Sequence, residues 1–240
     1  MFRGDATFKP SIENGLKISM IIPVLNEIDM IEATLSRLQP SRACGHEVIV
    51  VDGGSTDDTD RVAMPLADKV IKIEAGRARQ MNAGARASEG NILWFLHADT
   101  LVQTSTYQVL IDSLVECTAQ WGRFDIRLSG NGSLFYLVAW SINLRSRLTG
   151  IATGDQGIFV RSDVFSRSCG YEDIPLMEDI ELSRRLKKTE GRPLNLTHKL
   201  VTSSRRWESG GPLRVIGLMW ALRLAYALGV SPTKLAKRYQ

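Results

Sequence analysis

An acidic motif at the end of an apolar run is the most informative feature of this 240-residue sequence. Residues 92–96 read Ile-Leu-Trp-Phe-Leu, which is typical of a strand buried on both faces. His97 and Asp99 follow this strand directly. In open α/β sheets, ligands bind beyond the carboxyl ends of the strands. A carboxylate at that position suits a hard cation, which in turn binds a diphosphate.

A second acid occupies the same position after an earlier strand. Asp52 follows the apolar residues 48–51, and the two glycines behind it allow a ligand to approach the backbone closely. Its carboxylate is suited to accept a hydrogen bond from a base N–H or a ribose hydroxyl. Two acids at the exits of two parallel strands predict a polar crevice that binds phosphates.

Further polar residues lie beside these acids in the expected fold. Pro23, Asn26 and Glu27 end the first strand and begin a helix, where backbone N–H groups and side-chain acceptors face a ligand. The alternative is that Asn26 is a plain helix N-cap. Arg79 and Asn82 are three residues apart and share one helix face, and arginine suits phosphate recognition. The alternative there is a solvated basic face.

Two common nucleotide-binding signatures are missing from the sequence. No Gly-x-Gly-x-x-Gly follows the first strand, which argues against a dinucleotide-binding dehydrogenase. No Gly-x-x-x-x-Gly-Lys-[Ser/Thr] occurs either, which argues against a P-loop NTPase.

The elements that position these residues alternate between strand and helix as far as Asp99. This order predicts βαβ units and a mainly parallel α/β sheet with helices on both faces. Asn26 is expected to cap the first helix, and Pro40 and Gly45 to close it. Strands are expected at 18–24, 48–52, 70–73 and 92–96, with a short helix after Asp57 and a longer one at 77–88.

The pattern is less regular after Asp99, which fits a half of the molecule that holds a second substrate. We expect an N-terminal extension at 1–17, one domain over 18–210 with halves at 18–100 and 101–210, and a helical extension at 211–240. Helices are expected at 107–117, 134–148, 177–188 and 213–228, and strands at 122–128 and 157–161.

Composition restricts the partners and the compartment. The 30 Lys and Arg residues nearly balance the 26 Asp and Glu residues, and the net charge of +4 is no nucleic-acid signature. The three cysteines are far apart, as in a reduced cytoplasmic protein. Residues 1–17 contain no apolar core of a signal peptide, and no stretch reaches the ~20 apolar residues of a membrane span.

The last expected helix is apolar and carries Arg214 and Arg223. Packing against the core or against a second copy in a homodimer is one interpretation. Peripheral contact with the inner face of a membrane is the other, and three basic residues that follow the helix keep it open.

Four motifs in chain order resemble the signature blocks of inverting family-2 glycosyltransferases with the GT-A fold. The resemblance is close over residues 18–100 and looser to about residue 210. Further stretches at 76–82, 153–160 and 175–182 are similar to a bacterial subgroup associated with arsenosugar-type biosynthesis. The four motifs are Pro-Val-Leu-Asn-Glu at 23–27, Val-Asp-Gly-Gly-Ser-Thr-Asp at 51–57, Asn-Ala-Gly-Ala-Arg-Ala-Ser-Glu-Gly at 82–90 and Phe-Leu-His-Ala-Asp at 95–99.

The resemblance assigns roles in the nucleotide half. It implies that Asp52 binds the nucleotide base and that the block from Pro23 to Glu27 lines the nucleotide pocket. His97 and Asp99 match the Asp-x-Asp motif, whose last acid binds Mn²⁺ or Mg²⁺. Because His97 replaces the first acid, one negative charge is lost and Asp99 becomes the expected metal ligand. His97 is then an extra ligand suited to Mn²⁺, a contact to the ribose, or a structural residue.

The resemblance also assigns the acceptor half. The Glu178-Asp179 pair matches the block that supplies the general base, with Asp179 as the base and Glu178 orienting it or touching the acceptor. The alternative is that both acids only favour the helix dipole. Asp155 matches the acceptor block, or is a turn residue. Arg206 and Trp207 match an Arg-Trp motif that neutralises the diphosphate and stacks on a sugar, or they form a surface loop.

These residues imply an inverting, metal-assisted transfer of a sugar from a UDP- or GDP-type nucleotide sugar to an unknown acceptor hydroxyl. One rival is a binding protein for nucleotide sugars whose metal motif has decayed, as His97 allows. The other is a sugar nucleotidyltransferase, which the missing Gly-rich loop after the first strand argues against.

Overall fold

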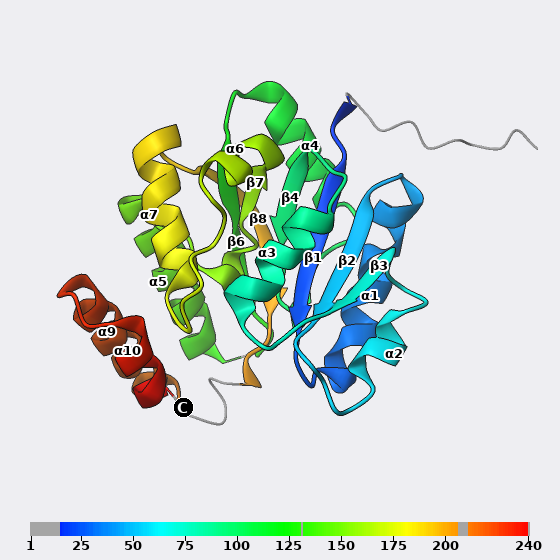
Figure 1. Ribbon diagram of the computed structural model, residues 1–240. Helices are drawn as coiled ribbons and strands as arrows, with labels where there is room; N and C mark the ends of the chain where they lie inside the picture. Colours follow the sequence, from blue (N-terminus) through cyan, green and yellow to red (C-terminus); the bar gives the residue numbers. More distant parts are fainter. Residues whose placement is uncertain (1–14, 131, 206–210, 240) are drawn as a thin grey trace, which may run out of the picture.

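The molecule is built around one mixed sheet that runs through its centre (Figure 1). The computed structural model describes residues 15–130, 132–205 and 211–239. Helices cover both faces of the sheet, and the predicted α/β class with mostly parallel strands is confirmed. The strand order is β3-β2-β1-β4-β7-β6-β8-β5.

The first half of the sheet is parallel throughout. Here β1 (Ile18–Val24) pairs with β2 (Glu47–Asp52) on one side and with β4 (Ile92–Phe95) on the other, and β2 pairs with β3 (Lys69–Lys72). The register aligns Val24 with Asp52, so the first two strands end side by side. In Figure 1 the carboxyl ends of these strands point to the lower edge of the sheet.

The second half of the sheet mixes directions. Here β7 (Phe159–Arg161) runs antiparallel to both β4 and β6 (Trp121–Leu128), and so joins the two halves. Beyond it, β6 runs parallel to β8 (Leu194–Thr202) with a register shift after Phe124, and β8 pairs with the short β5 (Thr100–Leu101).

Two apolar layers fix the helices to the sheet. Alternate residues of a buried strand point to opposite faces, so Met20 and Ile22 contact one layer while Ile21 contacts the other. One layer holds α1 (Ile28–Ala43) and α4 (Thr106–Glu116). The other holds α3 (Arg77–Ala87), α6 (Ser162–Arg167) and α7 (Glu178–Glu190). A short α2 (Thr59–Ala63) follows β2, and α5 (Ser133–Thr149) packs on β6.

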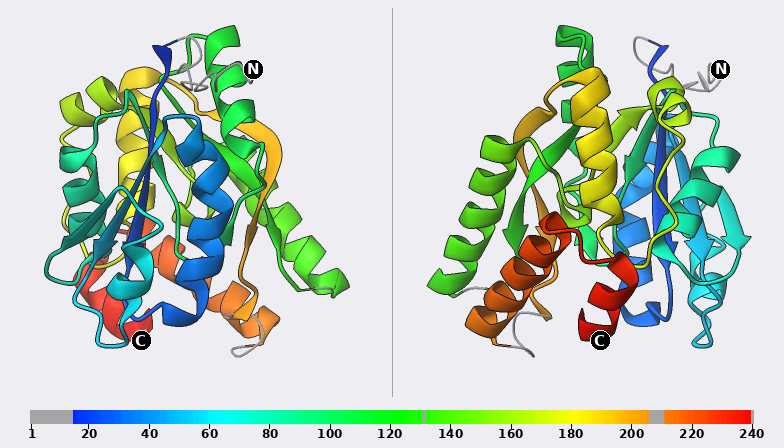
Figure 2. Two further views of the ribbon diagram at one scale, coloured as in Figure 1. Left: turned by 90° about the vertical axis from the view of Figure 1, so that its right-hand side faces the viewer. Right: turned by 60° about the vertical axis from the view of Figure 1, so that its left-hand side comes forward.

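The two last helices lie against the start of α7. Leu222 of α9 (Pro212–Ala227) and Leu235 of α10 (Pro232–Tyr239) are buried with Met177 and Ile180. Figure 2 shows this helix pair in orange and red, below the yellow α7 in the right-hand view. Trp220 of α9 keeps 62% of its surface exposed. Within the described ranges, no helix combines the length and the apolar character that crossing a membrane requires.

Several expected boundaries are wrong. Asn26 does not cap α1: its φ is 54°, Glu27 holds the N-cap position, and the Asn26 side chain accepts from Thr56 instead. Pro40 does not close α1 but lies in its last turn, where the helix ends three residues later at Ala43. Gly157 precedes β7 in a left-handed turn. Among the described residues, the elements that were not predicted are β5, β8, α6, α10 and the short 3-10 helix Gly154–Gln156.

Candidate functional site

The exit of β2 presents a carboxylate with one free oxygen. Asp52 is fully buried, and its Oδ1 accepts from the Ser55 N–H at 2.9 Å and from the Ser55 hydroxyl at 2.5 Å. Its Oδ2 is buried and has no hydrogen-bond partner. Because a buried carboxylate oxygen without a donor is costly, Oδ2 is available to a ligand donor at this strand end.

The exit of β1 is tied to the exit of β2. The Asn26 N–H donates to Ser55 Oγ at 2.9 Å, and Asn26 Oδ1 accepts from the Thr56 N–H at 2.8 Å. Pro23 lies one residue before the end of β1, opposite Val51. These bonds hold the two loops at a fixed spacing beyond the strands.

A buried glutamine that sequence reasoning missed fixes the same two strands. Gln80 Nε2 donates to the carbonyls of Val24 and Val51, both at 2.8 Å. The sequence signal that could have identified Gln80 is its position on α3 beside Ala78 and Met81, which are small or apolar and are buried in the structure. The ends of β1 and β2 are therefore held from α3 as well as by their own ladder.

The exit of β4 places His97 and Asp99 next to a turn from the second half. A Cβ on Gly154 would lie 2.5 Å from His97 Nε2, so glycine is required there. That nitrogen is buried and has no hydrogen-bond partner in the described chain. Burial lowers the pKa of His97 to about 3, aided by the charge of Arg77, so the imidazole is neutral at pH 7.

The charges of two arginines that were not among the predicted site residues act on Asp99. Burial raises the pKa of Asp99, and the nearby charges of Arg205 and Arg77 act in the opposite direction. Arg205 Nη2 also lies 3.4 Å from Glu27 Oε2, and burial raises the pKa of Glu27 despite this partner. Positive charge therefore gathers at the exits of β1 and β4, where a diphosphate is expected to bind.

The donor atoms suit a cation that shares its coordination with a bound ligand. Asp99 offers a carboxylate, and His97 Nε2 is a neutral imidazole nitrogen without a partner. Among the residues that the structure describes, no three His, Cys, Asp or Glu side chains gather into a metal-binding group. A cation here would need oxygen ligands from the diphosphate itself, as Mg²⁺ commonly does.

The start of α7 faces the same turn from the other side. Asp179 Oδ2 accepts from the Gly154 N–H at 2.8 Å, and its Oδ1 accepts from the Ile180 N–H at 2.7 Å. Met177 before the pair adopts φ 72°, which turns the chain sharply into the helix. Gly154 therefore lies between His97 on one side and Asp179 on the other.

Glu178, the residue before Asp179, has a raised pKa. Its side chain is buried, and burial together with the Asp179 carboxylate raises its pKa to about 7. Arg77 Nη1 lies 3.8 Å from Glu178 Oε1 and opposes that rise. Asp155, one residue after Gly154, has a buried Oδ1 without a partner. Asp155, Glu178 and Asp179 therefore lie at or next to the Gly154 turn.

Two predicted nucleotide residues make contacts elsewhere. Asn82 donates to the Tyr171 carbonyl at 2.8 Å and accepts from the Tyr171 N–H at 2.9 Å, so both ends of its amide are used. Arg79 pairs with Glu74 at 3.0 Å and with Asp173 at 3.2 Å on the exposed side of α3. Arg206 and Trp207 lie outside the described residues.

The comparison with family models decides the family. Residues 19–165, more than half of the chain, match the model described as Glycosyl transferase family 2. The chain belongs to this family. A 116-residue stretch is 33% identical to an uncharacterised glycosyltransferase of Rickettsia conorii and covers 46% of this chain and 19% of that protein. A 97-residue stretch is 29% identical to glucosyl-3-phosphoglycerate synthase of Mycobacterium tuberculosis. It covers 36% of this chain and 30% of that protein.

Solved structures show the same fold, which confirms the predicted GT-A-like class. Glucosyl-3-phosphoglycerate synthase of Mycobacterium tuberculosis with Mn²⁺, UDP and glucosyl-3-phosphoglycerate superposes with a TM-score of 0.65 at 20% identity, covering 89% of this chain and 79% of that one. TarS of S. aureus with UDP-GlcNAc gives 0.66 at 19% identity, covering 79% and 59%. The chain spans a fifth to a third of the length of the curated relatives that it matches.

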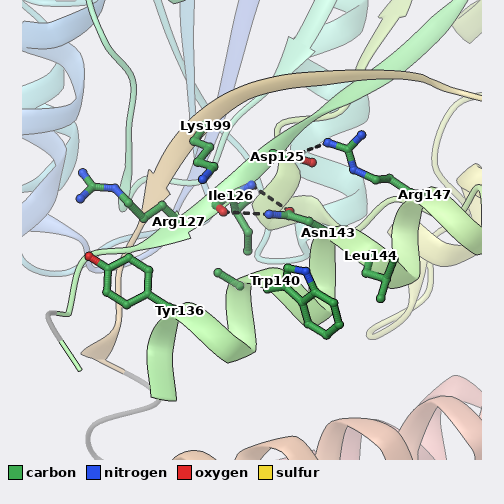
Figure 3. Close-up of a pocket in the computed structure, with 10 residues that line it drawn as sticks. Asp125, Ile126, Arg127, Tyr136, Trp140, Asn143, Leu144, Arg147 and Lys199 are labelled. Atoms are coloured by element: carbon green, nitrogen blue, oxygen red, sulfur yellow. Dashed lines mark hydrogen bonds and ion pairs between the residues drawn. The ribbon is translucent and has the colours of Figure 1, made fainter. Parts of the chain in front are cut away.

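A cavity of about 450 Å³ lies apart from these strand ends, between α5 and the strands β6 and β8 (Figure 3). Arg147 closes one side through an ion pair to Asp125 at 2.5 Å. Asn143 pairs with both backbone groups of Ile126. None of the residues that line it was predicted as part of the site. The lining consists of Asp125, Ile126, Arg127, Tyr136, Ala139, Trp140, Asn143, Leu144, Arg147 and Lys199.

Proposed function

We propose that the chain is an inverting glycosyltransferase that moves a sugar from a nucleoside-diphosphate sugar to an acceptor hydroxyl. One observation carries the proposal. The exits of three adjacent parallel strands lie at one edge of the sheet. Gly154 packs against His97 at that edge, and its N–H donates to Asp179, so the proposed base lies close to the strand ends. Donor groups on one side and a carboxylate on the other are what a displacement at a sugar carbon needs.

The proposed reaction is a single displacement. Asp179 accepts the proton of the acceptor hydroxyl while the acceptor oxygen bonds to the anomeric carbon, and the bond from that carbon to the diphosphate oxygen breaks. One base on the face opposite the leaving group gives inversion, whereas retention needs a second nucleophile. Glu178, buried beside Asp179, orients the base or contacts the acceptor.

The departing diphosphate requires positive charge. Asp99, with His97 as an additional ligand, is proposed to hold a Mn²⁺ or Mg²⁺ ion, which neutralises the leaving group when it is bound. Arg77 and Arg205 supply fixed positive charge at the same strand ends. Arg206 is proposed to share this role, with Trp207 stacking on a sugar.

The relatives indicate where to begin the search for a donor. One superposed structure contains UDP with Mn²⁺, and another contains UDP-GlcNAc. A UDP sugar is therefore the first donor class that we propose for this chain, ahead of a GDP sugar. Membership of the subgroup associated with arsenosugar-type biosynthesis is a further proposal, supported by the residues at 76–82, 153–160 and 175–182.

One observation favours a second function. His97 stands where the resemblance expects an acid, which suits a protein that binds nucleotide sugars without transferring them. Release of UDP separates the two. UDP sugars are screened by thermal stabilisation with and without Mn²⁺, and those that stabilise the chain are then assayed for UDP release with a set of hydroxyl acceptors.

We expect stabilisation by at least one UDP sugar, a larger effect with Mn²⁺, and release of UDP that a chelator suppresses. Stabilisation without UDP release at any acceptor would favour the binding protein. Release that survives a saturating chelator would remove the metal from the proposal and retain the transfer.

A further inference from the structure

Two partly buried arginines on the acceptor side have no contacting acid in the part of the chain that the structure describes. The Nε atoms of Arg145 on α5 and Arg223 on α9 are both covered and lack a hydrogen-bond partner. Within residues 15–130, 132–205 and 211–239, neither guanidinium has a carboxylate oxygen within 4.0 Å. Other arginines of this half, such as Arg123 and Arg147, are paired with an acid.

Arg145 reaches the turn that carries the proposed chemistry. Its Nη2 donates to Thr153 Oγ1 at 3.4 Å, and Thr153 is followed by Gly154 and Asp155. Burial lowers the pKa of Arg145 to about 10, with a further lowering by Arg223. The charges of Asp155 and Asp179 act in the opposite direction, so both carboxylates and the Arg223 guanidinium lie within electrostatic reach of Arg145.

Arg223 lies near Arg145 and belongs to α9, the first of the two C-terminal helices. α9 packs against α5, and Leu222, the residue before Arg223, is buried with Ile180 of α7. The same packing therefore fixes Arg223 beside Arg145 and keeps both helices next to the proposed base. Figure 2 shows α9 between the green α5 and the start of α7 in its right-hand view.

The nearby acids do not neutralise these cations at contact distance. Both oxygens of Asp179 accept backbone N–H groups, and Asp155 Oδ1 has no hydrogen-bond partner among the described residues. Holding two like charges partly out of water without a contacting anion is unfavourable. Such an arrangement is typical of a site whose anion arrives with the ligand, because guanidinium groups bind oxyanions with two parallel hydrogen bonds.

We propose that Arg145 and Arg223 bind an oxyanion that belongs to the acceptor, which makes the acceptor a hydroxyl compound bearing a phosphate or carboxylate group. The inference rests on the proposed transferase function and specifies its second substrate. The hydroxyl end lies toward Asp155 and Asp179, and the anionic end toward the two arginines. The acceptor is thus held at both ends beside the donor.

Inorganic phosphate is the probe that tests this subsite. It is titrated by calorimetry into the full chain saturated with UDP, at constant ionic strength, with acetate in a parallel arm. The variants are Arg145→Gln and Arg223→Gln, and Arg145→Lys retains the charge without the planar fork. Arg214→Gln is the matched control, since Arg214 is an exposed arginine of the same helix as Arg223.

We expect phosphate to bind the wild-type chain and to bind each Gln variant roughly tenfold or more weakly, the scale of one lost charge-assisted hydrogen bond. The phosphate affinity of Arg145→Lys should be intermediate, and that of Arg214→Gln should equal the wild-type value. The affinity for UDP should be the same in all variants. Tighter binding of acetate than of phosphate assigns a carboxylate to the acceptor.

Equal phosphate affinity in folded Gln variants overturns the subsite, as does the absence of saturable binding of either anion to the wild-type chain. A matching loss of UDP affinity in the variants also overturns it, because the arginines would then serve the donor. Failure of the wild-type chain to bind UDP counts against the transferase, and the phosphate titration without UDP still reports on the subsite.

Discussion

The two halves of the sheet are stabilised by different interactions. In the parallel half, the strands β2, β1 and β4 are buried and largely apolar, and their acids lie at the strand ends, as Asp52 does. The mixed half buries charge inside the strand itself: Arg123 of β6 is fully covered and pairs with Asp125, which also binds Arg147 at 2.5 Å.

We interpret this difference as a division of labour between nucleotide binding in the parallel half and acceptor binding in the mixed half. Apolar strands with polar ends make a crevice for a nucleotide, and the buried surface stabilises the sheet whatever ligand binds. Buried ion pairs add little net stability but accept few alternative arrangements, so we interpret them as fixing one geometry for one acceptor. Variants in the first half should therefore change donor binding, and variants in the second should change transfer.

The largest expected effect comes from the proposed base. Asp179→Asn keeps the shape of the side chain and removes its basicity, so turnover should fall by about 10²–10⁴-fold. Donor affinity should stay near the wild-type value, whereas the thermal midpoint should fall modestly, because the amide nitrogen cannot accept one of the two backbone N–H bonds that Asp179 accepts. Single-turnover transfer, calorimetry with UDP and thermal unfolding on the same sample check all three, with the exposed Glu172→Gln as the control. Wild-type turnover in Asp179→Asn would move the role to Asp155.

The raised pKa of Glu178 should make the free energy of unfolding depend on pH. Its pKa is raised by burial and by Asp179 to about 7, so the folded chain binds this proton more tightly than the unfolded chain. The free energy of unfolding therefore falls as pH rises from about 4.5 to about 7. Glu178→Gln lacks this loss and should exceed the wild type by up to about 3 kcal/mol above pH 7, at about 1.4 kcal/mol per pKa unit.

Denaturant unfolding of both proteins at pH 5 and pH 8 measures this difference. The advantage of Glu178→Gln should be small at pH 5 and large at pH 8. An advantage that does not change with pH would show that Glu178 is ionised in both states and has no raised pKa.

A smaller effect is expected at the exit of β2. Asp52→Ala removes the carboxylate whose Oδ2 is free for a ligand, and should weaken UDP binding about tenfold or more. Calorimetry on the folded variant measures it. Asp58→Ala, which removes an exposed acid of the same loop, should bind UDP like the wild type. Unchanged affinity in Asp52→Ala would exclude the base-binding role.

The smallest effect is expected at Asn82, for which the sequence and the structure indicate different roles. Asn82 was predicted to bind the nucleotide, but its amide pairs with both backbone groups of Tyr171. Asn82→Ala should lower the free energy of unfolding by about 1 kcal/mol, the net scale of such hydrogen bonds, and leave UDP affinity unchanged. A clear loss of UDP affinity at unchanged stability would restore the predicted nucleotide contact.

The sequence predicted the parallel half well because its strands are continuous apolar runs. β1 was expected at 18–24 and lies there, and β2 and β4 differ from expectation by one residue at an end. The mixed half was harder, since β8 reads Leu-Asn-Leu-Thr-His-Lys-Leu-Val-Thr and lacks a clean alternation. Its strand character comes from pairing with β6, which a local pattern does not contain.

The site divides in the same way. Acids that end a strand or begin a helix were recognisable from their neighbours, as Asp52, Asp99 and Asp179 were. Arg145 and Arg223 were not singled out, because each lies within a helix and acquires its role only when α9 packs on α5. Asn82 and Arg79 were placed correctly on a helix, but their partners Tyr171 and Asp173 are about ninety residues away along the chain.

The pairing of β4 with β7 has a consequence for how the chain is made. On a ribosome, the parallel half is complete once residue 95 has emerged, yet one side of β4 has no partner until residues 159–161 follow. At roughly 5–20 residues per second, that interval is about 3–13 seconds. During it, the apolar edge Ile-Leu-Trp-Phe is open to strands of other chains. Slowed translation between these two strands should therefore reduce the soluble yield more than slowing after residue 161.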